Sequence, residues 1–310
     1  MGRTRWDAAA WMTRSTAYVG KSADAIYTSA APDAKMVPNT IDFREARDSV
    51  HNPASTPIIL ALDCTGSMNA VLEVAVKKFG VVIQELIDRK PVTDPAIMTM
   101  VFDDVEYVRG ASGVLQVSQF ESDDKAVDQL EKMHLTRMGG GNQSESYHLP
   151  LYMAAFKTKT DAFEKRNEKG YLFVVGDEQV PEKLTKAQIQ DVFGPDEYVE
   201  GDGFTYDELY AAASRMYNVF HVVVMQGSHA HSRGEAKMRE VWSKHVGQNL
   251  IILDDIASLP EVIVSTIQVH RGADADSVAA SWSGTTAVVV KKATTGLTAP
   301  AAPGGGVVKL

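Results

Sequence analysis

Short apolar runs alternate with longer segments of helical periodicity along most of the chain. Ile58–Leu62 is the clearest apolar run, and five similar runs follow it. Apolar runs of this length, bounded by polar residues, are typical of strands buried on both faces. The predicted strands are 58–63, 97–103, 114–120, 171–176, 218–225 and 250–253. The predicted helices are 69–89, 122–133, 145–157, 185–193, 206–216, 233–246 and 258–269. This alternation predicts an α/β fold, a doubly wound and mostly parallel six-stranded sheet with helices on both faces.

The two ends of the chain differ from this middle in composition. Helical patterns cover 6–13 and 22–28, where Trp6 and Trp11 are costly to leave in water and are expected to pack on the domain or on a partner. From Ala273 onward Ala, Ser, Thr, Gly and Pro predominate, which is linker chemistry, although 286–291 could add a strand. We therefore predict an N-terminal extension (1–54), one α/β domain (55–270) and a flexible or docking tail (271–310).

Composition and charge narrow the classes of partner. The chain is 45% hydrophobic and 23% charged, as is ordinary for a globular protein. Its formal net charge of −9 and the lack of a basic patch with interleaved aromatics argue against binding nucleic acid or anionic membranes. No apolar run is long enough to span a membrane, and we see no secretory signal. The single cysteine, Cys64, excludes an internal disulfide and fits a reducing compartment.

Oxygen-bearing side chains follow the first predicted strand of the domain. The strand ends on Asp63, and the hydroxyl residues Thr65 and Ser67 follow at alternate positions. In parallel α/β sheets, ligands gather beyond the carboxyl ends of the strands. Carboxylate and hydroxyl oxygens are hard donors that suit Mg²⁺ or Mn²⁺ better than zinc or copper. The alternative is a plain strand-to-helix turn in which Ser67 or Asn69 caps the helix.

Two later segments carry similar donors. A glycine triplet, 139–141, precedes Asn142, Ser144 and Glu145, and such a triplet is best explained where the backbone takes positive φ or approaches a ligand closely. The strand 171–176 ends, like the first, on an acid, Asp177. The alternatives are a flexible turn with a helix cap in the first case and a solvated loop acid in the second. Together the three segments predict one metal site.

The pattern Asp63-x-Thr65-x-Ser67 after an apolar strand resembles the metal-ion-dependent adhesion site of von Willebrand factor type A domains. The family pattern is Asp-x-Ser-x-Ser, so Thr65 keeps the hydroxyl. The resemblance implies that 114–120 is the antiparallel edge strand and that Asp177 approaches the metal. The family's second metal loop usually supplies a Thr. Here Asn142 stands nearest that place, with Ser144 and Glu145 as other donors.

Further segments resemble a group of type A proteins from bacteria and their phages, among them Arg47-Asp48-Ser49 and Gly176-Asp177-Glu178. Stand-alone bacterial members of the wider family often act as substrate adaptors of MoxR-type AAA+ ATPases. The resemblance therefore implies a non-enzymatic, cytoplasmic or virion-associated module. It would bind Mg²⁺ or Mn²⁺ and, through the metal, an Asp or Glu of a protein partner. The competing hypothesis is a structural or assembly component of a phage particle or injection machine, whose chain ends bind neighbours.

Catalytic motifs are largely missing. The chain has neither a Gly-x-x-x-x-Gly-Lys phosphate loop nor a Gly-x-Ser-x-Gly elbow. Asp63 invites comparison with the nucleophile of haloacid-dehalogenase phosphatases, but Thr65 occupies the place of the second acid and removes the general acid. His221, His229 and His231 could suggest zinc, yet no further ligand is spaced to complete such a site. A phosphatase remains a minor alternative.

Overall fold

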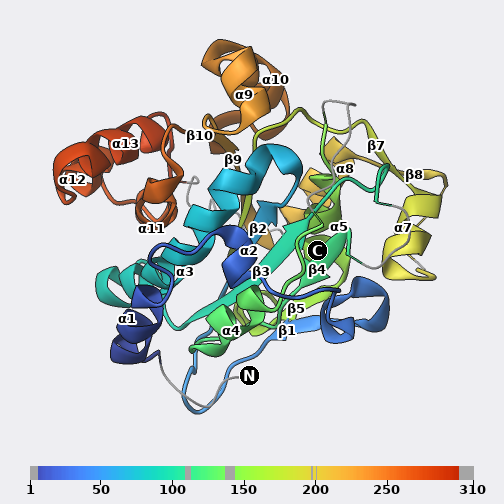
Figure 1. Cartoon of the computed structure of the whole chain (residues 1–310), viewed down its shortest axis with the longest axis horizontal. Coiled ribbons are helices and arrows are strands. Elements are labelled where there is room, and N and C mark those ends of the chain that lie inside the picture. The colour runs from blue at the N-terminus through green and yellow to red at the C-terminus, as the bar shows by residue number, and fades with distance from the viewer. Residues whose placement is uncertain (1–5, 109–112, 137–143, 197, 200, 300–310) are drawn as a thin grey trace, which may run out of the picture.

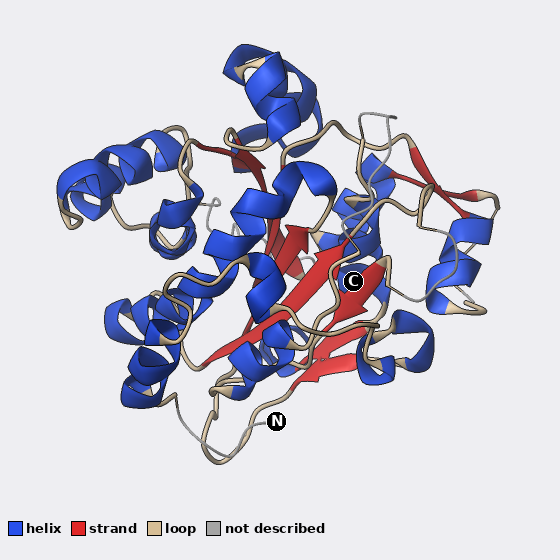
Figure 2. Cartoon of the chain, viewed as in Figure 1, coloured by secondary structure: helices blue, strands red, loops and turns tan. Residues whose placement is uncertain are grey.

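The computed structural model describes residues 6–108, 113–136, 144–196, 198–199 and 201–299 of the chain. Its centre is a six-stranded sheet with helices on both sides (Figure 1 and Figure 2). In chain order the strands are β2 (Thr56–Asp63), β3 (Pro95–Phe102), β4 (Leu115–Val117), β6 (Gly170–Gly176), β9 (Tyr217–Val224) and β10 (Leu250–Leu253). In space the order is β10-β9-β6-β2-β3-β4, and only the β3–β4 pair is antiparallel. The predicted doubly wound sheet and its antiparallel edge strand are confirmed.

The described residues also form thirteen α-helices. They are α1 (Ala8–Thr16), α2 (Ala23–Ile26), α3 (Asn69–Arg89), α4 (Lys125–Glu131), α5 (His148–Phe156), α6 (Asp161–Arg166), α7 (Lys186–Phe193), α8 (Tyr206–Ala213), α9 (Ser228–Arg233), α10 (Glu235–Val246), α11 (Leu259–His270), α12 (Ala275–Ala280) and α13 (Gly284–Thr294). Two short pairs of strands complete the fold. They are the parallel β1 (Arg44–Ala46) and β5 (Thr158–Thr160), and the antiparallel β7 (Lys183–Thr185) and β8 (Gly203–Thr205).

Alternate residues of β2 enter two separate hydrophobic cores. Ile58 and Leu62 contribute to the core beneath α3, α4 and α11, whereas Ile59 and Ala61 contribute to the core beneath α5, α8 and α10. All eight residues of β2 are buried, which explains the continuous apolar run in the sequence. Helices therefore cover both faces of the sheet, and its carboxyl edge is left to the connecting loops.

The C-terminal segment differs from the prediction. The expected strand at 286–291 is wrong, because these residues lie in α13. Val290 is fully buried and Val288 is 69% exposed, so the valine run presents one side to the core, and α13 packs against α11 and β10. Packing has here overridden the β preference of three consecutive valines. His229 and His231, expected in a loop, lie in the short helix α9.

The N-terminal helices pack on the domain, as the two tryptophans predict. Trp11 is buried in the core beneath α3, and a Cβ at Gly80 of α3 would overlap its indole ring. Trp6 donates a hydrogen bond from Nε1 to Gln84 Oε1 at 2.9 Å. Within the described part of the chain, every helix is too short or too polar to cross a lipid bilayer.

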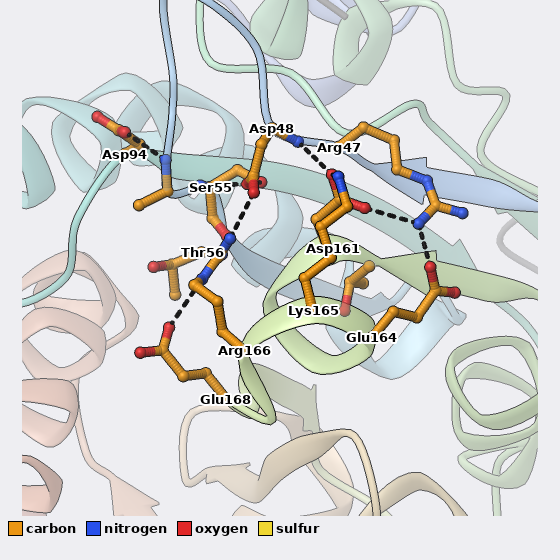
Figure 3. A network of polar contacts seen from close by, with 12 residues as sticks. Arg47, Asp48, Ser55, Thr56, Asp94, Asp161, Glu164, Lys165, Arg166 and Glu168 are labelled. Carbon is orange, nitrogen blue, oxygen red and sulfur yellow. Dashed lines mark hydrogen bonds and ion pairs between the residues drawn. The ribbon is translucent and has the colours of Figure 1, made fainter.

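Figure 3 shows how the segment that precedes β2 is tied to α6. Asp161 accepts hydrogen bonds from Arg47 Nη1 and from the backbone N–H of Asp48, both at 2.9 Å. Arg166 donates in turn to Asp48 Oδ2 at 2.5 Å and to the carbonyl of Ser55 at 2.8 Å. This network ties Asp48 and Ser55, which precede β2, to helix α6. It therefore fixes the start of the strand that ends at Asp63.

Candidate metal centre

Asp63 and Asp177 meet at the carboxyl edge of the sheet, where the strand order reverses. Asp63 is the last residue of β2 and Asp177 follows β6, and the register pairs Leu62 with Val175. From β2 the chain continues to β3, the neighbour of β2 on one side, whereas β6 is the neighbour of β2 on the other side. A crevice at such a reversal is the usual ligand position of doubly wound folds.

Short polar contacts join four of the predicted metal ligands. Asp63 Oδ1 accepts hydrogen bonds from the backbone N–H of Thr65 at 2.9 Å and from its hydroxyl at 2.6 Å. The hydroxyl oxygens of Thr65 and Ser67 lie 3.1 Å apart, and the Ser67 hydroxyl donates to Asp177 Oδ1 at 2.7 Å. Asp63, Thr65 and Asp177 are fully or almost fully buried. The structure therefore brings these donors from β2 and β6 together in one place.

Tyr147 completes the wall of the site and was not among the predicted residues. Its hydroxyl donates to Asp63 Oδ2 at 3.2 Å and accepts a hydrogen bond from the backbone N–H of Glu178 at 2.9 Å. Its ring lies against Gly176, where a Cβ would overlap it. The hydroxyl thus spans the ends of β2 and β6. A tyrosine beside an apolar helix resembles ordinary core, so the sequence carries no signal for this role.

Asp177 is held from its other side by Gly227 and the first turn of α9, which follow β9. The backbone N–H of His229 donates to Asp177 Oδ2 at 2.9 Å. Gly227 approaches the carboxyl group so closely that a Cβ would overlap it, although its φ of −63° is open to any residue. Gly227 is therefore needed for its small size, and it leaves the carboxylate of Asp177 facing Ser67.

Buried carboxyl groups gather at this site. Burial raises the pKa of Asp63 despite the hydrogen bonds from Thr65, and the charge of Asp177 raises it further. Burial, followed by the charge of Asp63, raises the pKa of Glu145. Burial and the charge of Asp177 raise the pKa of Glu178 to about 7. A bound cation would offset the cost of keeping these groups ionised.

The remaining predicted donors lie in or beside the glycine-rich loop. Asn142 and the glycine triplet lie outside the described residues. Ser144 forms a β-bridge with Gln179 near the end of β6. Glu145 is 3% exposed, and among the described residues its Oε2 atom has no hydrogen-bond partner.

Asp103 and Thr136 adjoin the site, and neither was predicted. Asp103 follows β3, and its Oδ2 atom accepts a hydrogen bond from the Thr136 hydroxyl. The Thr136 hydroxyl also lies 3.7 Å from the sulfur of Cys64, which is buried beside the metal turn. Asp103 could have been found in the sequence, because it ends an apolar strand as Asp63 does.

The donor set fits a hard divalent cation. Two carboxylates and two hydroxyls are oxygen ligands of the kind that Mg²⁺ and Mn²⁺ prefer. Within the described ranges, no three His, Cys, Asp or Glu side chains are placed to hold a metal together. The hydroxyls of Thr65 and Ser67 are therefore essential to any site here, and a histidine-based zinc site finds no support in the described residues.

The comparisons with known proteins give no sequence match. No protein-family model matches the chain, and no curated protein sequence matches it. The solved structures that it resembles include the pilus adhesin SpaC from Lactobacillus rhamnosus GG in its open conformation. The TM-score is 0.46 at 8% identity, over 77% of this chain and 33% of SpaC.

Two further solved structures resemble the fold. One is the protein BatB from Bacteroides thetaiotaomicron, with a TM-score of 0.37 at 14% identity over 67% of this chain and 95% of BatB. The other is proximal thread matrix protein 1 from the mussel byssus with a zinc-occupied MIDAS motif, with a TM-score of 0.39 at 9% identity over 74% of this chain and 48% of the byssus protein. The chain spans about a third of SpaC and about half of the byssus protein. These identities and scores assign neither a family nor an activity to the chain.

Proposed function

We propose that the chain is a protein-binding module that acts through a bound Mg²⁺ or Mn²⁺ ion. The proposed ligands are Asp63, Thr65, Ser67 and Asp177, with Asn142 from the glycine-rich loop and Ser144 or Glu145 as alternative donors. The observation that carries the proposal is the run of short polar contacts from Asp63 through the hydroxyl oxygens of Thr65 and Ser67 to Asp177. It joins the ends of two strands at the reversal of the sheet order.

The chemistry of these donors favours an acidic partner. When bound, the cation supplies positive charge that neutral hydroxyl ligands compensate only in part. Mg²⁺ demands six oxygen ligands in octahedral geometry and keeps water where the protein supplies none. Asp63 and Asp177 are fully buried, whereas Ser67 is only half-buried, so the open side of the site lies near Ser67. An Asp or Glu carboxylate of a protein partner would replace water at that side.

The alternatives have less support. A phosphatase needs a second acid two residues after the nucleophile, whereas the hydroxyl of Thr65 donates to Asp63 Oδ1 at 2.6 Å. We therefore infer a non-enzymatic role. An assembly component would bind neighbours through its chain ends, but the described parts of both ends, α1 and α13, pack on the domain itself. Because of the family resemblance, a MoxR-type AAA+ ATPase is the first partner to test.

Water-proton relaxation on bound Mn²⁺ tests the proposal. We expect one Mn²⁺ per chain with water in its coordination sphere, and we expect the relaxivity to fall when a capped aspartyl peptide is added. The matched peptide with Asn in place of Asp should leave the relaxivity unchanged. Mn²⁺ that binds the Asp63→Ala variant as it binds the wild type would overturn the assignment of the site. Mn²⁺ that binds but ignores the aspartyl peptide would overturn the proposed mode of partner binding.

A further inference from the structure

A pocket with aromatic walls lies away from the candidate metal centre, at the other edge of the sheet. It has a volume of about 310 Å³. Met216, on its wall, directly precedes β9 at the amino edge of the sheet, whereas Asp63 and Asp177 lie at the carboxyl edge. Helix α5 separates the two places, since it follows Tyr147 and ends at Phe156 on the wall of the pocket. Its 9 residues span about 14 Å, so the pocket is a feature distinct from the metal centre.

Aromatic rings form much of the wall of this pocket. Four of them line it, those of Phe43, Phe156, Phe163 and Tyr198. The rings of Phe156 and Tyr198 are stacked, with centroids 5.3 Å apart and 24° between their planes, and Tyr198 is 41% exposed. Phe156 stacks in turn on Phe204, with a centroid distance of 5.6 Å. A flat ring of a ligand can extend a stack of this kind.

The wall of the pocket is also positively charged. Lys159 and Arg215 both line it, and none of the described residues of the wall is an Asp or a Glu. The Nζ atom of Lys159 lies 3.7 Å from the centroid of the Phe43 ring, which is a cation–π contact. Because the pocket already holds a cation on one of its rings, it is unsuited to a second one. In a chain with a formal net charge of −9, this wall complements an anion.

Acidic residues close in sequence to the wall do not neutralise its two cations. Asp196 is paired with Lys157, whose Nζ lies 2.8 Å from its Oδ2 atom. Glu164 is paired with Arg47. Asp42 is exposed and lies outside the wall. The ion pairs of the described residues therefore leave both cations of the wall to interact with a ligand.

The size of the pocket indicates a small molecule. Its volume of about 310 Å³ is at the lower end of the range of about 300–1,000 Å³ that is usual for small-molecule pockets. One ring system with an attached acid suits such a space. The planar guanidinium of an arginine matches the geometry of a carboxylate, which it can bind through two N–H groups at once.

We propose that this pocket binds a small aromatic carboxylate. The ring of the ligand packs against Phe156 and Tyr198, and its carboxylate interacts with Lys159 and Arg215. The proposal needs no metal ion, so it goes beyond the proposed function and does not depend on it. It gives the chain a small-molecule ligand in addition to a protein partner.

The test uses a fluorinated naphthoate as the probe, titrated with the full chain in EDTA and followed by fluorine NMR. The corresponding naphthamide is the uncharged control, and the corresponding naphthylmethylammonium ion is the cationic one. The charge variant is Lys159→Gln with Arg215→Gln. Its matched control is Lys186→Gln with Arg239→Gln, an exposed lysine and an exposed arginine outside the pocket. We expect the charge variant to bind naphthoate about tenfold more weakly and the control to bind it like the wild type.

A second pair of variants tests the position of the ligand. Ala212→Phe places a ring inside the pocket, and Ala211→Phe places the same ring at an exposed position of the same helix, outside the pocket. We expect Ala212→Phe to abolish naphthoate binding and Ala211→Phe to leave it unchanged. Urea unfolding of both variants checks that each is folded.

Several outcomes would overturn the proposal. Absence of naphthoate binding to the wild type would do so, and so would equal binding to the wild type and a folded Ala212→Phe variant. If the naphthamide binds as tightly as the naphthoate, the two cations do not recognise the ligand. Tighter binding of the ammonium ion would make the pocket a site for cations. A peptide that ends in phenylalanine and displaces the naphthoate at lower concentration would assign the pocket to a protein C-terminus instead.

Discussion

Individual side chains at the metal centre depend on one another for their orientation. Asp63 accepts both hydrogen bonds of Thr65 on one oxygen and faces Tyr147 with the other. Asp177 is confined between Ser67 and His229. Because each carboxylate is buried and oriented before any cation arrives, little side-chain freedom remains to be lost on binding.

Asp63→Asn separates the carboxylate charge from its hydrogen bonds. The amide keeps the shape of the side chain and an oxygen for Thr65, so we expect stability in EDTA to stay within about 1 kcal/mol of the wild type. The rise in Tm with Mg²⁺ should disappear, since a charged ligand is lost. Thermal unfolding with and without Mg²⁺ measures both. The control is Asp276→Asn, whose side chain is 79% exposed and which should keep the full rise.

Gly227→Ala tests the position of Asp177. The new methyl group would overlap the Asp177 carboxyl, and the φ of −63° means that no backbone strain is added. Overpacking of this kind costs about 1–3 kcal/mol, so we expect Mn²⁺ affinity to fall by about tenfold or more. Titration calorimetry measures the affinity. An unchanged affinity would remove Asp177 from the proposed ligand set.

At the scale of elements, a short strand and a short helix outside the predicted pattern anchor the sheet. β5 and α6 were not predicted, yet they hold the entry to β2 through Asp161 and Arg166. Burial alone would raise the pKa of Asp161. Hydrogen bonds from Lys165, the Asp48 backbone and Arg47 outweigh it and lower this pKa to about 2. The ionised carboxylate therefore stabilises the folded state.

This lowered pKa predicts a pH dependence of stability with a definite sign. The contribution of Asp161 is fully present above its ordinary pKa of 3.8 and is lost as the pH falls through the folded-state pKa of about 2. The stability difference between wild type and Asp161→Asn should thus shrink between about pH 6 and about pH 3 in urea unfolding. A difference that grows on acidification would contradict it. Glu168→Gln, which removes a surface ion pair with Arg166, should cost less than about 1 kcal/mol.

Helix α13 offers a matched pair of substitutions that tests the folding of the C-terminal segment. Val290 is fully buried and Val288 is 69% exposed on the same helix. We expect Val290→Asp to destabilise the protein by about 3 kcal/mol or more, because it buries an unpaired charge. Val288→Asp should change stability by less than about 0.5 kcal/mol. Urea unfolding of the two variants gives the answer, and equal effects would mean that α13 does not pack on the domain in solution.

At the scale of the whole molecule, the site joins parts of the chain that are far apart in sequence. Ser67 and Asp177 are separated by 110 positions, and Tyr147 and Asp63 by 84. The sheet order brings them together, because β6 returns to the side of β2 opposite β3. A cation bound here would connect the two halves of the sheet and should stabilise the entire fold.

That stabilisation can be predicted by mass action. If the cation binds only the folded chain, Mg²⁺ or Mn²⁺ at about one hundred times Kd should add about 2.7 kcal/mol to the free energy of unfolding. Urea unfolding in metal and in EDTA, combined with an independent Kd, provides the measurement. If metal binds without raising the free energy of unfolding, the unfolded chain binds it equally well. That outcome would contradict a site that is preformed in the folded chain.

Much of the fold and part of the site could be predicted from local patterns. The hydrophobic periodicity over 69–89 predicts both ends of α3. Thr185, expected as a helix cap, is the N-cap of α7 and forms a capping box. These signals are local, since burial on one face repeats with the helical period and a cap needs only a neighbouring N–H group. The same logic singled out Asp63 and Asp177, because each ends a continuous apolar strand.

The contacts around the strand-end acids and the helical conformation of the valine run depend on tertiary structure and cannot be predicted from local patterns. Tyr147 reaches Asp63, and Gly227 makes room for Asp177, because loops from different strands converge at one edge of the sheet. The valines around Val290 favour a strand by propensity, yet they form a helix because one side of that helix meets α11. The sequence by itself determined the strands, the main helices and the acids at the strand ends. Long-range packing alone decided which groups surround those acids, since such contacts depend on strand order rather than on neighbours in the chain.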